Sequence, residues 1–269
     1  MNIKNLVIRA TTGVVYIAIV LAGLLAGPYA FAIVFGLFLC VALFEYYRII
    51  ENDVRIRPDK LLNIVSGVII FILSLFLSHY TRSAIVVYLL LQFIIAVFSK
   101  KENPFINTIY SIFGQLYVTT PLLLLSLIYS NQSIMSYKII IAIFVFIWIN
   151  DTAAYVVGSL FGKHKLIERI SPKKTIEGFV GGVAMAAASA FLFAYYIPEY
   201  SIYFWIGFGL IASLMGTAGD LFESLIKRTY SVKDSGRIVP GHGGILDRID
   251  SLLFATVAIY LYLFFTLAV

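Results

Sequence analysis

Charge is scarce in this chain. Only 13% of its 269 residues are Asp, Glu, Lys or Arg, and 61% are hydrophobic, whereas soluble domains contain about 25% charged and about 45–50% apolar residues. This composition excludes an ordinary soluble domain. It also argues against nucleic-acid binding, because there is no soluble basic domain to carry it. The net charge of +6 instead suits an anionic membrane surface.

Cysteine and histidine are almost absent. Cys40 is the single cysteine, so no intrachain disulfide can form, and a lone apolar thiol is expected to serve packing. The three histidines are scattered along the chain, which argues against a soft-metal site. The first apolar run lacks a convincing cleavage pattern and is interpreted as a membrane span, not a signal peptide.

Long apolar runs predict an all-α, polytopic transmembrane bundle, because each crossing needs about 20 apolar residues. A barrel would instead alternate apolar and polar residues. About nine spans are predicted, at residues 7–26, 29–47, 61–79, 83–98, 105–129, 137–159, 178–197, 200–222 and 250–268. With a cytoplasmic amino terminus, all of the 20 Lys and Arg residues except Arg82 and Lys138 lie on the cytoplasmic side.

The two halves of the chain differ in how much their residues indicate about function. Residues 1–136 are interpreted as amino-terminal spans that face lipid or support assembly, and residues 137–269 as a catalytic membrane region with two charged cytoplasmic loops. Glu45 is the main exception in the first half. It is interpreted as an interfacial partner of Arg48, with a substrate-facing carboxylate as the alternative.

The first charged segment begins with Asp151, at the end of a span, with Tyr155 on the same helical face. Either a substrate contact or simple interfacial solvation explains Asp151. Ser171 and Pro172 then predict a helix start, and the residues that follow, Lys173-Lys174-Thr175, favour phosphate binding at that helix end. The alternative is a basic loop that only sets topology.

The end of the eighth predicted span places Asp220, Glu223 and Lys227 on one helix face. An intramembrane carboxylate is costly, so Asp220 is expected to contact a metal ion or substrate. For Glu223 and Lys227, an i, i+4 ion pair is the structural alternative.

The segment 224–250 carries the densest charge. Its basic residues suit a polyphosphate, and the oxygens of Asp247 and Asp250 suit magnesium. A helix N-cap is the alternative for Asp250. His242 is expected either to act in acid–base chemistry or to hydrogen-bond the loop. Glycines allow close backbone approach.

Together these residues resemble the phosphatidate cytidylyltransferase, or CDP-diacylglycerol synthase, family. Its signature reads Ser-x-x-Lys-Arg-x4-Lys-Asp-x-Gly-x3-Pro-x-His-Gly-Gly-x-x-Asp-Arg-x-Asp, and every position matches here. The matching residues are Ser224, Lys227, Arg228, Lys233, Asp234, Gly236, Pro240, His242, Gly243, Gly244, Asp247, Arg248 and Asp250. Upstream, Asp151, Tyr155 and Gly158 and the run Ser171–Gly178 also resemble the family, although many members have tryptophan where this chain has Ile176.

The resemblance implies a magnesium-dependent enzyme that makes CDP-diacylglycerol and pyrophosphate from CTP and phosphatidate. A centre of two cations is implied near Asp220 and Asp247, and the second cation is either divalent or monovalent. The expected metal ligands are Asp220, Asp247, Asp250 and Glu223. The expected catalytic residues are Asp220, Asp247, Asp250, Lys227 and Arg228. The expected substrate-binding residues are Asp151, Lys173, Lys174, Thr175, Ser224, Lys233, Asp234, Arg237, His242, Gly243, Gly244 and Arg248.

The expected location is the inner (plasma) membrane, with the active site on the cytoplasmic side and membrane lipids as neighbours. For the amino-terminal spans, a lipid funnel and self-association as a homodimer both stay open. Two other functions compete with this interpretation: a CTP-dependent lipid-alcohol kinase, and a secondary transporter of an anionic solute.

Overall fold

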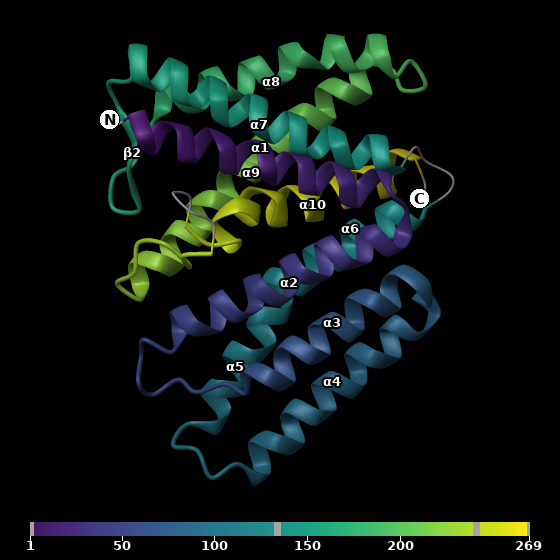
Figure 1. Cartoon of the computed structure of the whole chain (residues 1–269), viewed down its shortest axis with the longest axis vertical. Helices are drawn as coiled ribbons and strands as arrows, with labels where there is room; N and C mark the ends of the chain where they lie inside the picture. Colours follow the sequence, from purple (N-terminus) through teal and green to yellow (C-terminus); the bar gives the residue numbers. More distant parts are fainter. Residues whose placement is uncertain (1–2, 132–135, 239–242, 268–269) are drawn as a thin grey trace. The chain divides into compact units, whose positions relative to one another are not determined.

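The chain forms helices joined by short loops, with one small sheet (Figure 1). The computed structural model describes residues 3–131, 136–238 and 243–267. The elements are α1 Ile3–Leu25, α2 Pro28–Ile50, α3 Lys60–Phe76, α4 Ser78–Phe98, α5 Pro104–Gly114, the π-helix η1 Gln115–Thr119, α6 Thr120–Ser130, α7 Ser136–Phe161, β1 Lys165–Ile167, β2 Ser171–Thr175, α8 Ile176–Tyr196, α9 Ile202–Thr229 and α10 Leu246–Leu267.

The helices confirm the predicted fold class. Within the described residues, seven helical segments are long and apolar enough to cross a membrane: α2, α4, the continuous run α5–η1–α6, α7, α8, α9 and α10. The other two predicted spans coincide with shorter apolar helices, Thr11–Leu25 in α1 and Lys60–Phe76 in α3. The orientation of the bundle in the membrane stays a prediction.

The chain divides into two compact units. The first consists of Met1–Ser130 and Thr229–Ile249, and the second of Asn131–Arg228 and Asp250–Val269. The segment that joins α9 to α10 therefore belongs to the first unit, although both flanking helices lie mostly in the second. The predicted functional division at residue 136 concerns lipid contact and catalysis, and it stays a prediction.

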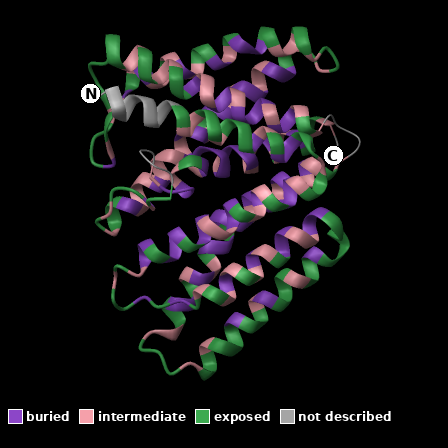
Figure 2. Ribbon diagram, viewed as in Figure 1, coloured by how far each residue is buried: buried purple, intermediate pink, exposed green. Residues whose placement is uncertain are grey.

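The first unit packs α2 against α1 and α3, and Figure 2 shows its buried residues along these helices. A polar cluster lies inside it around the buried side chain of Asn63. The Asn63 amide donates to Ser111 Oγ at 2.9 Å, and its oxygen accepts from Tyr88 and Gln92, each at 2.9 Å. Between apolar helices such hydrogen bonds replace the hydrophobic effect as a source of specific association.

In the second unit, small residues let helices approach closely. α7 packs along α8, and a side chain at Gly181 would overlap Val157. α9 meets α10 at Gly219, where an added Cβ would collide with the backbone carbonyl of Asp250. Such contacts are typical of membrane helices, whose backbones approach through glycine.

The predicted helix start at Ser171 and Pro172 is wrong. These residues belong to β2, which pairs antiparallel with β1, and α8 begins at Ile176. Thr175 is the N-cap, and its hydroxyl accepts from Gly178 N–H at 3.2 Å. A hydroxyl cap satisfies an otherwise unpaired helical N–H. Proline has no backbone N–H to donate, so it is tolerated in an edge strand such as β2.

The last helix begins at Leu246, not at residue 250 as predicted. The N-cap alternative for Asp250 is therefore wrong, because Asp250 lies more than one turn inside α10. Asp247 occupies the first turn instead, where a negative charge is favourable to the helix dipole.

Candidate functional site

A cavity of about 530 Å³ lies in the second unit. It is formed by α7, both strands of the hairpin, α8 and α9. The lining residues are Asn150, Asp151, Ala154, Tyr155, Gly158, Ser159, Lys165, Leu166, Lys173, Lys174, Thr175, Gly178, Phe179, Thr217 and Asp220. The structure therefore brings together five residues predicted from separate motifs: Asp151, Lys173, Lys174, Thr175 and Asp220.

Asp220 contacts both a cationic and a hydroxyl side chain at this cavity. One of its oxygens contacts the Lys174 ammonium group, and the other accepts from Ser224 Oγ at 3.4 Å. Asp250 is near enough to interact electrostatically with Asp220, Asp151 and Lys227. Both signs of charge thus meet at one wall, as phosphate and cation binding require.

The donor chemistry at this wall fits a magnesium ion. Asp220, which lines the cavity, and Asp250 of the neighbouring helix α10 offer hard carboxylate oxygens, and Mg²⁺ prefers such ligands. Across residues 3–131, 136–238 and 243–267, no group of three or more His, Cys, Asp or Glu side chains is placed so that it could hold a metal ion.

Glu223 and Lys227 form the i, i+4 ion pair that the sequence offered as an alternative. Both side chains are buried, with relative exposures of 1% and 10%. Their predicted roles in metal binding and catalysis stay predictions. Arg228 is exposed, and its Nε donates to the Ile170 carbonyl at 3.5 Å, so it connects α9 to the hairpin loop.

Two residues to which the sequence analysis gave no role of their own make hydrogen bonds in or beside this cavity. Glu177 accepts hydrogen bonds from the backbone N–H groups of Lys163 and His164, and lies 2.6 Å from His164 Nδ1. Asn150 is buried, and its amide donates to Asp151 and to Thr217 Oγ1, each at 3.3 Å. Only the polarity of Asn150 within an apolar run signalled a role.

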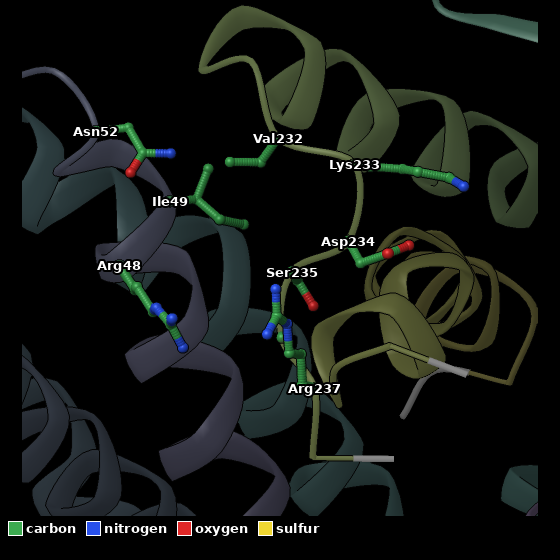
Figure 3. Close-up of a pocket in the computed structure, with 9 residues that line it drawn as sticks. Arg48, Ile49, Asn52, Val232, Lys233, Asp234, Ser235 and Arg237 are labelled. Carbon is green, nitrogen blue, oxygen red and sulfur yellow. The ribbon is translucent and has the colours of Figure 1, made fainter. Parts of the chain in front are cut away.

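A second cavity, of about 340 Å³, lies in the first unit (Figure 3). It is formed by the carboxyl-terminal end of α2 and the chain that follows α9. The lining residues are Arg48, Ile49, Asn52, Val232, Lys233, Asp234, Ser235, Gly236 and Arg237. The predicted residues Lys233, Asp234 and Arg237 therefore line one pocket, together with Arg48 and Ile49 of α2 and Asn52 just after it, which were not predicted for it.

Asp247 stabilises the chain around this pocket. One carboxylate oxygen accepts from Ser235 N–H at 2.9 Å, Ser235 Oγ at 2.8 Å and Gly244 N–H at 2.8 Å. The backbone of Gly243 has a φ of +87°, a left-handed conformation that favours glycine. The predicted part of Asp247 in a shared cation centre with Asp220 stays a prediction, since the two residues belong to different units.

Glu45 is the residue whose role the sequence interpretation missed. Its side chain is only 1% exposed and accepts from Ser235 Oγ at 3.0 Å, Ile245 N–H at 3.2 Å and Leu246 N–H at 2.8 Å. It is therefore neither interfacial nor paired with Arg48. A Cβ at Gly244 would overlap the Glu45 carboxylate, so the close backbone approach expected of this glycine is made toward Glu45.

The remaining predicted residues lie as follows. Arg248 is exposed, and its carbonyl accepts from the Tyr16 hydroxyl at 3.3 Å. His242 lies outside the described residues. Each unit thus has a candidate cavity of its own, one around Asp220 and the other around Arg237.

Comparison with known proteins decides the family. A sequence model of the cytidylyltransferase family matches residues 7–266, nearly the whole chain. The chain belongs to the cytidylyltransferase family.

Curated relatives are consistent with this membership. The chain is 51% identical over 113 residues to a phosphatidate cytidylyltransferase of Staphylococcus aureus (strain COL), an alignment that covers 41% of this chain and 43% of the relative. It is 41% identical over 160 residues to a phosphatidate cytidylyltransferase of Staphylococcus saprophyticus, covering 59% of this chain and 60% of the relative. The matched regions thus span about half the length of these relatives.

Proposed function

We propose that this protein transfers a cytidylyl group from CTP to phosphatidate, and so makes CDP-diacylglycerol and pyrophosphate in a membrane. The observation that supports this most is the cavity around Asp220, in which the lysines of the Ser171–Thr175 motif lie with a carboxylate of α9, a helix long and apolar enough to cross a membrane. Family membership and the names of the relatives support the same reaction.

The reaction requires an oxygen of the phosphatidate phosphate to attack the α-phosphorus of CTP. A new phosphorus–oxygen bond forms, the bond from the α-phosphorus to the bridging oxygen breaks, and pyrophosphate leaves with that oxygen. Such transfer depends mainly on positioning and charge neutralisation. Lys173 and Lys174, which both line the cavity, are suited to bind and orient the phosphates. Lys174 contacts Asp220 in this structure, so phosphate binding would compete for its ammonium group.

Asp220 and Asp250 are the residues proposed to hold Mg²⁺, with Glu223 and Asp247 in supporting roles. When bound, the ion neutralises developing charge on the phosphate oxygens. Asp220 also accepts from Ser224, which fixes the direction of its carboxylate.

The proposed setting is the plasma membrane of a bacterial cell, with both cavities facing the cytoplasm, where CTP is present. The clustering of basic residues in the loops supports this orientation. Self-association of the amino-terminal spans as a homodimer belongs to the same proposal.

Product analysis tests the function. Purified full-length protein in detergent would be incubated with phosphatidate, MgCl₂ and CTP that carries label either on the α- or on the γ-phosphate. We expect α-label in a lipid product and γ-label in pyrophosphate, both abolished by EDTA. Asp220→Asn should reduce turnover by at least about 100-fold, because the ion that would neutralise the developing negative charge loses a charged ligand. The matched control is Glu199→Gln, on an exposed carboxylate that lines neither cavity.

The same assay separates the competing functions. With diacylglycerol in place of phosphatidate, transfer of γ-label to the lipid hydroxyl with release of CDP, and no α-label in lipid from phosphatidate, would support a lipid-alcohol kinase and refute our proposal. Absence of any labelled product from folded protein, with solute uptake in proteoliposomes, would support a transporter.

A further inference from the structure

The pocket at the end of α2 has an excess of positive charge. Its lining includes three cationic side chains, Arg48, Lys233 and Arg237, and one carboxylate, that of Asp234. Concave surfaces that gather one sign of charge attract ligands of the opposite sign. The ligand chemistry that fits this pocket is therefore anionic.

Arg48 has no acidic partner of its own among the described residues. The nearest carboxylate along the helix, Glu45, instead contacts Ser235 and the backbone at the start of α10. The next two acids, Glu51 and Asp53, each pair with a different basic residue, at 2.5 and 2.8 Å. The charge of Arg48 is thus available to a ligand.

The two arginines of the pocket converge. In Figure 3, Arg48 extends from α2 and Arg237 from the loop into the same part of the pocket, whereas Lys233 and Asp234 extend to the other side. Two like charges repel unless an anion lies between them. Guanidinium groups match phosphate geometry through paired N–H donors.

The pocket is held in place from both ends. Ser235 is fixed by Glu45 and by Asp247, and the Asn52 amide donates to the Tyr230 carbonyl at 3.4 Å. A rigid pocket loses little ordering entropy on binding. Its volume of about 340 Å³ suits a phosphate or diphosphate group.

We propose that Arg48 and Arg237 together bind a phosphate group of a substrate, so that α2 adds a binding residue that lies outside the signature. The inference rests on the proposed function for the identity of the substrate. That phosphate belongs either to CTP or to phosphatidate, and experiment distinguishes these two sources.

Binding without turnover is the test. Full-length wild type, Arg48→Gln and Arg48→Lys would be compared in detergent for equilibrium binding of radiolabelled CTP with MgCl₂, and separately of phosphatidate in mixed micelles. Cytidine and diacylglycerol, which lack the phosphates, serve as the matching probes. Arg82→Gln is the control variant, because it removes the same charge from an exposed position on α4 that lines neither cavity.

We expect Arg48→Gln to weaken binding of one phosphate-bearing probe about tenfold or more, since it removes charge-assisted hydrogen bonds. Binding of cytidine and diacylglycerol should not change. Arg48→Lys should lose less, because it keeps the charge but not the paired donors. A selective loss for CTP assigns the pocket to the nucleotide phosphates, and a selective loss for phosphatidate assigns it to the lipid headgroup.

Equal affinities in Arg48→Gln and Arg82→Gln for both probes would overturn the proposal, and Arg48 would then only stabilise the carboxyl-terminal end of α2. Size-exclusion chromatography checks that each variant is folded. If Arg48→Gln does not fold, Arg48→Lys takes its place, and wild-type affinity of Arg48→Lys for both CTP and phosphatidate would also overturn the proposal. A wild type that binds through Arg48 but yields no CDP-diacylglycerol would instead refute the proposed function and leave the phosphate pocket standing.

Discussion

Substitution of Glu45 by glutamine gives the sharpest test of how the α9–α10 segment is held. The Glu45 carboxylate accepts from Ile245 N–H at Oε1 and from Leu246 N–H at Oε2, and its Oε2 shares the one Ser235 hydroxyl proton with Asp247. Glutamine keeps the shape of the side chain but replaces one acceptor oxygen by a donor amide. At least one buried backbone N–H therefore loses its acceptor in either amide orientation.

The magnitude follows from these contacts. An unsatisfied buried donor costs about 1–3 kcal/mol, and hydrogen bonds to a charged group contribute about 1 kcal/mol more than neutral ones. We therefore expect Glu45→Gln to lower the free energy of unfolding by about 2–4 kcal/mol. Glu45→Ala removes all three acceptor contacts and should cost more, because Gly236 and Gly244 pack directly against this carboxylate.

Thermal unfolding in detergent measures the global effect, and amide hydrogen exchange of Ile245 and Leu246 measures the local one. Glu51→Gln is the matched control, because Glu51 lies at the end of the same helix in a partly exposed ion pair with Lys60, worth about 0–1 kcal/mol. If both variants unfold alike and the two amides keep wild-type exchange rates, the reasoning is wrong and Glu45 does not stabilise this segment.

Two further predictions concern charge pairs. Lys227→Met should lower the free energy of unfolding by about 3–5 kcal/mol, because it removes the cation that contacts buried Glu223. Denaturant titration should show that the double variant Lys227→Met, Glu223→Leu recovers much of this loss. If the effects of the two substitutions simply add, the pairing is contradicted. At the surface, hydrogen bonds from Arg55 hold the pKa of Asp53 at about 2. Because a lowered folded-state pKa stabilises the native state only while the carboxylate is ionised, this contribution is complete above the unfolded pKa of about 3.9 and is lost as pH falls through about 2. The small difference in melting temperature between wild type and Asp53→Asn should therefore shrink as pH falls from about 4 and vanish below about pH 2, and an undiminished difference there would contradict it.

The helices were predictable because the membrane imposes one simple requirement. A span must satisfy its backbone hydrogen bonds internally, so an apolar run of sufficient length predicts a helix whatever its neighbours are. The ends of the helices were harder to predict where an apolar run gives way to polar residues. The apolar character of the last span starts only after Asp250, yet α10 starts at Leu246, since the backbone N–H of Leu246 already has an acceptor in Glu45.

The short hairpin was not predictable from local patterns. Ser171-Pro172 is equally suited to a first helical turn and to an edge strand. The pairing of Lys165 with Thr175 and of Ile167 with Ser171 decides for the strand. Strands of 3 and 5 residues are too short for an alternating pattern to stand out.

The candidate site was predictable at the residues whose charge is energetically costly near a membrane. Asp220, Lys173 and Lys174 were found because charges near the membrane need a reason, and the structure brings all three to one cavity. Predicting that Lys174 pairs with Asp220 was not feasible, because one lies before α8 and the other near the end of α9.

Glu45 shows the limit of reasoning from one sequence. Its helix neighbours, Tyr46, Tyr47 and Arg48, are typical of a membrane interface, so the local pattern favoured an interfacial carboxylate. Its actual partners, Ser235, Ile245 and Leu246, are 190 to 201 positions away. A buried carboxylate must be compensated, but sequence says only that a partner exists and not which one. The same contacts turn Glu45 away from Arg48, and this leaves the arginine beside the pocket for a phosphate. An amino-terminal helix that looked like lipid-facing scaffold therefore both stabilises the signature segment and supplies a candidate substrate contact.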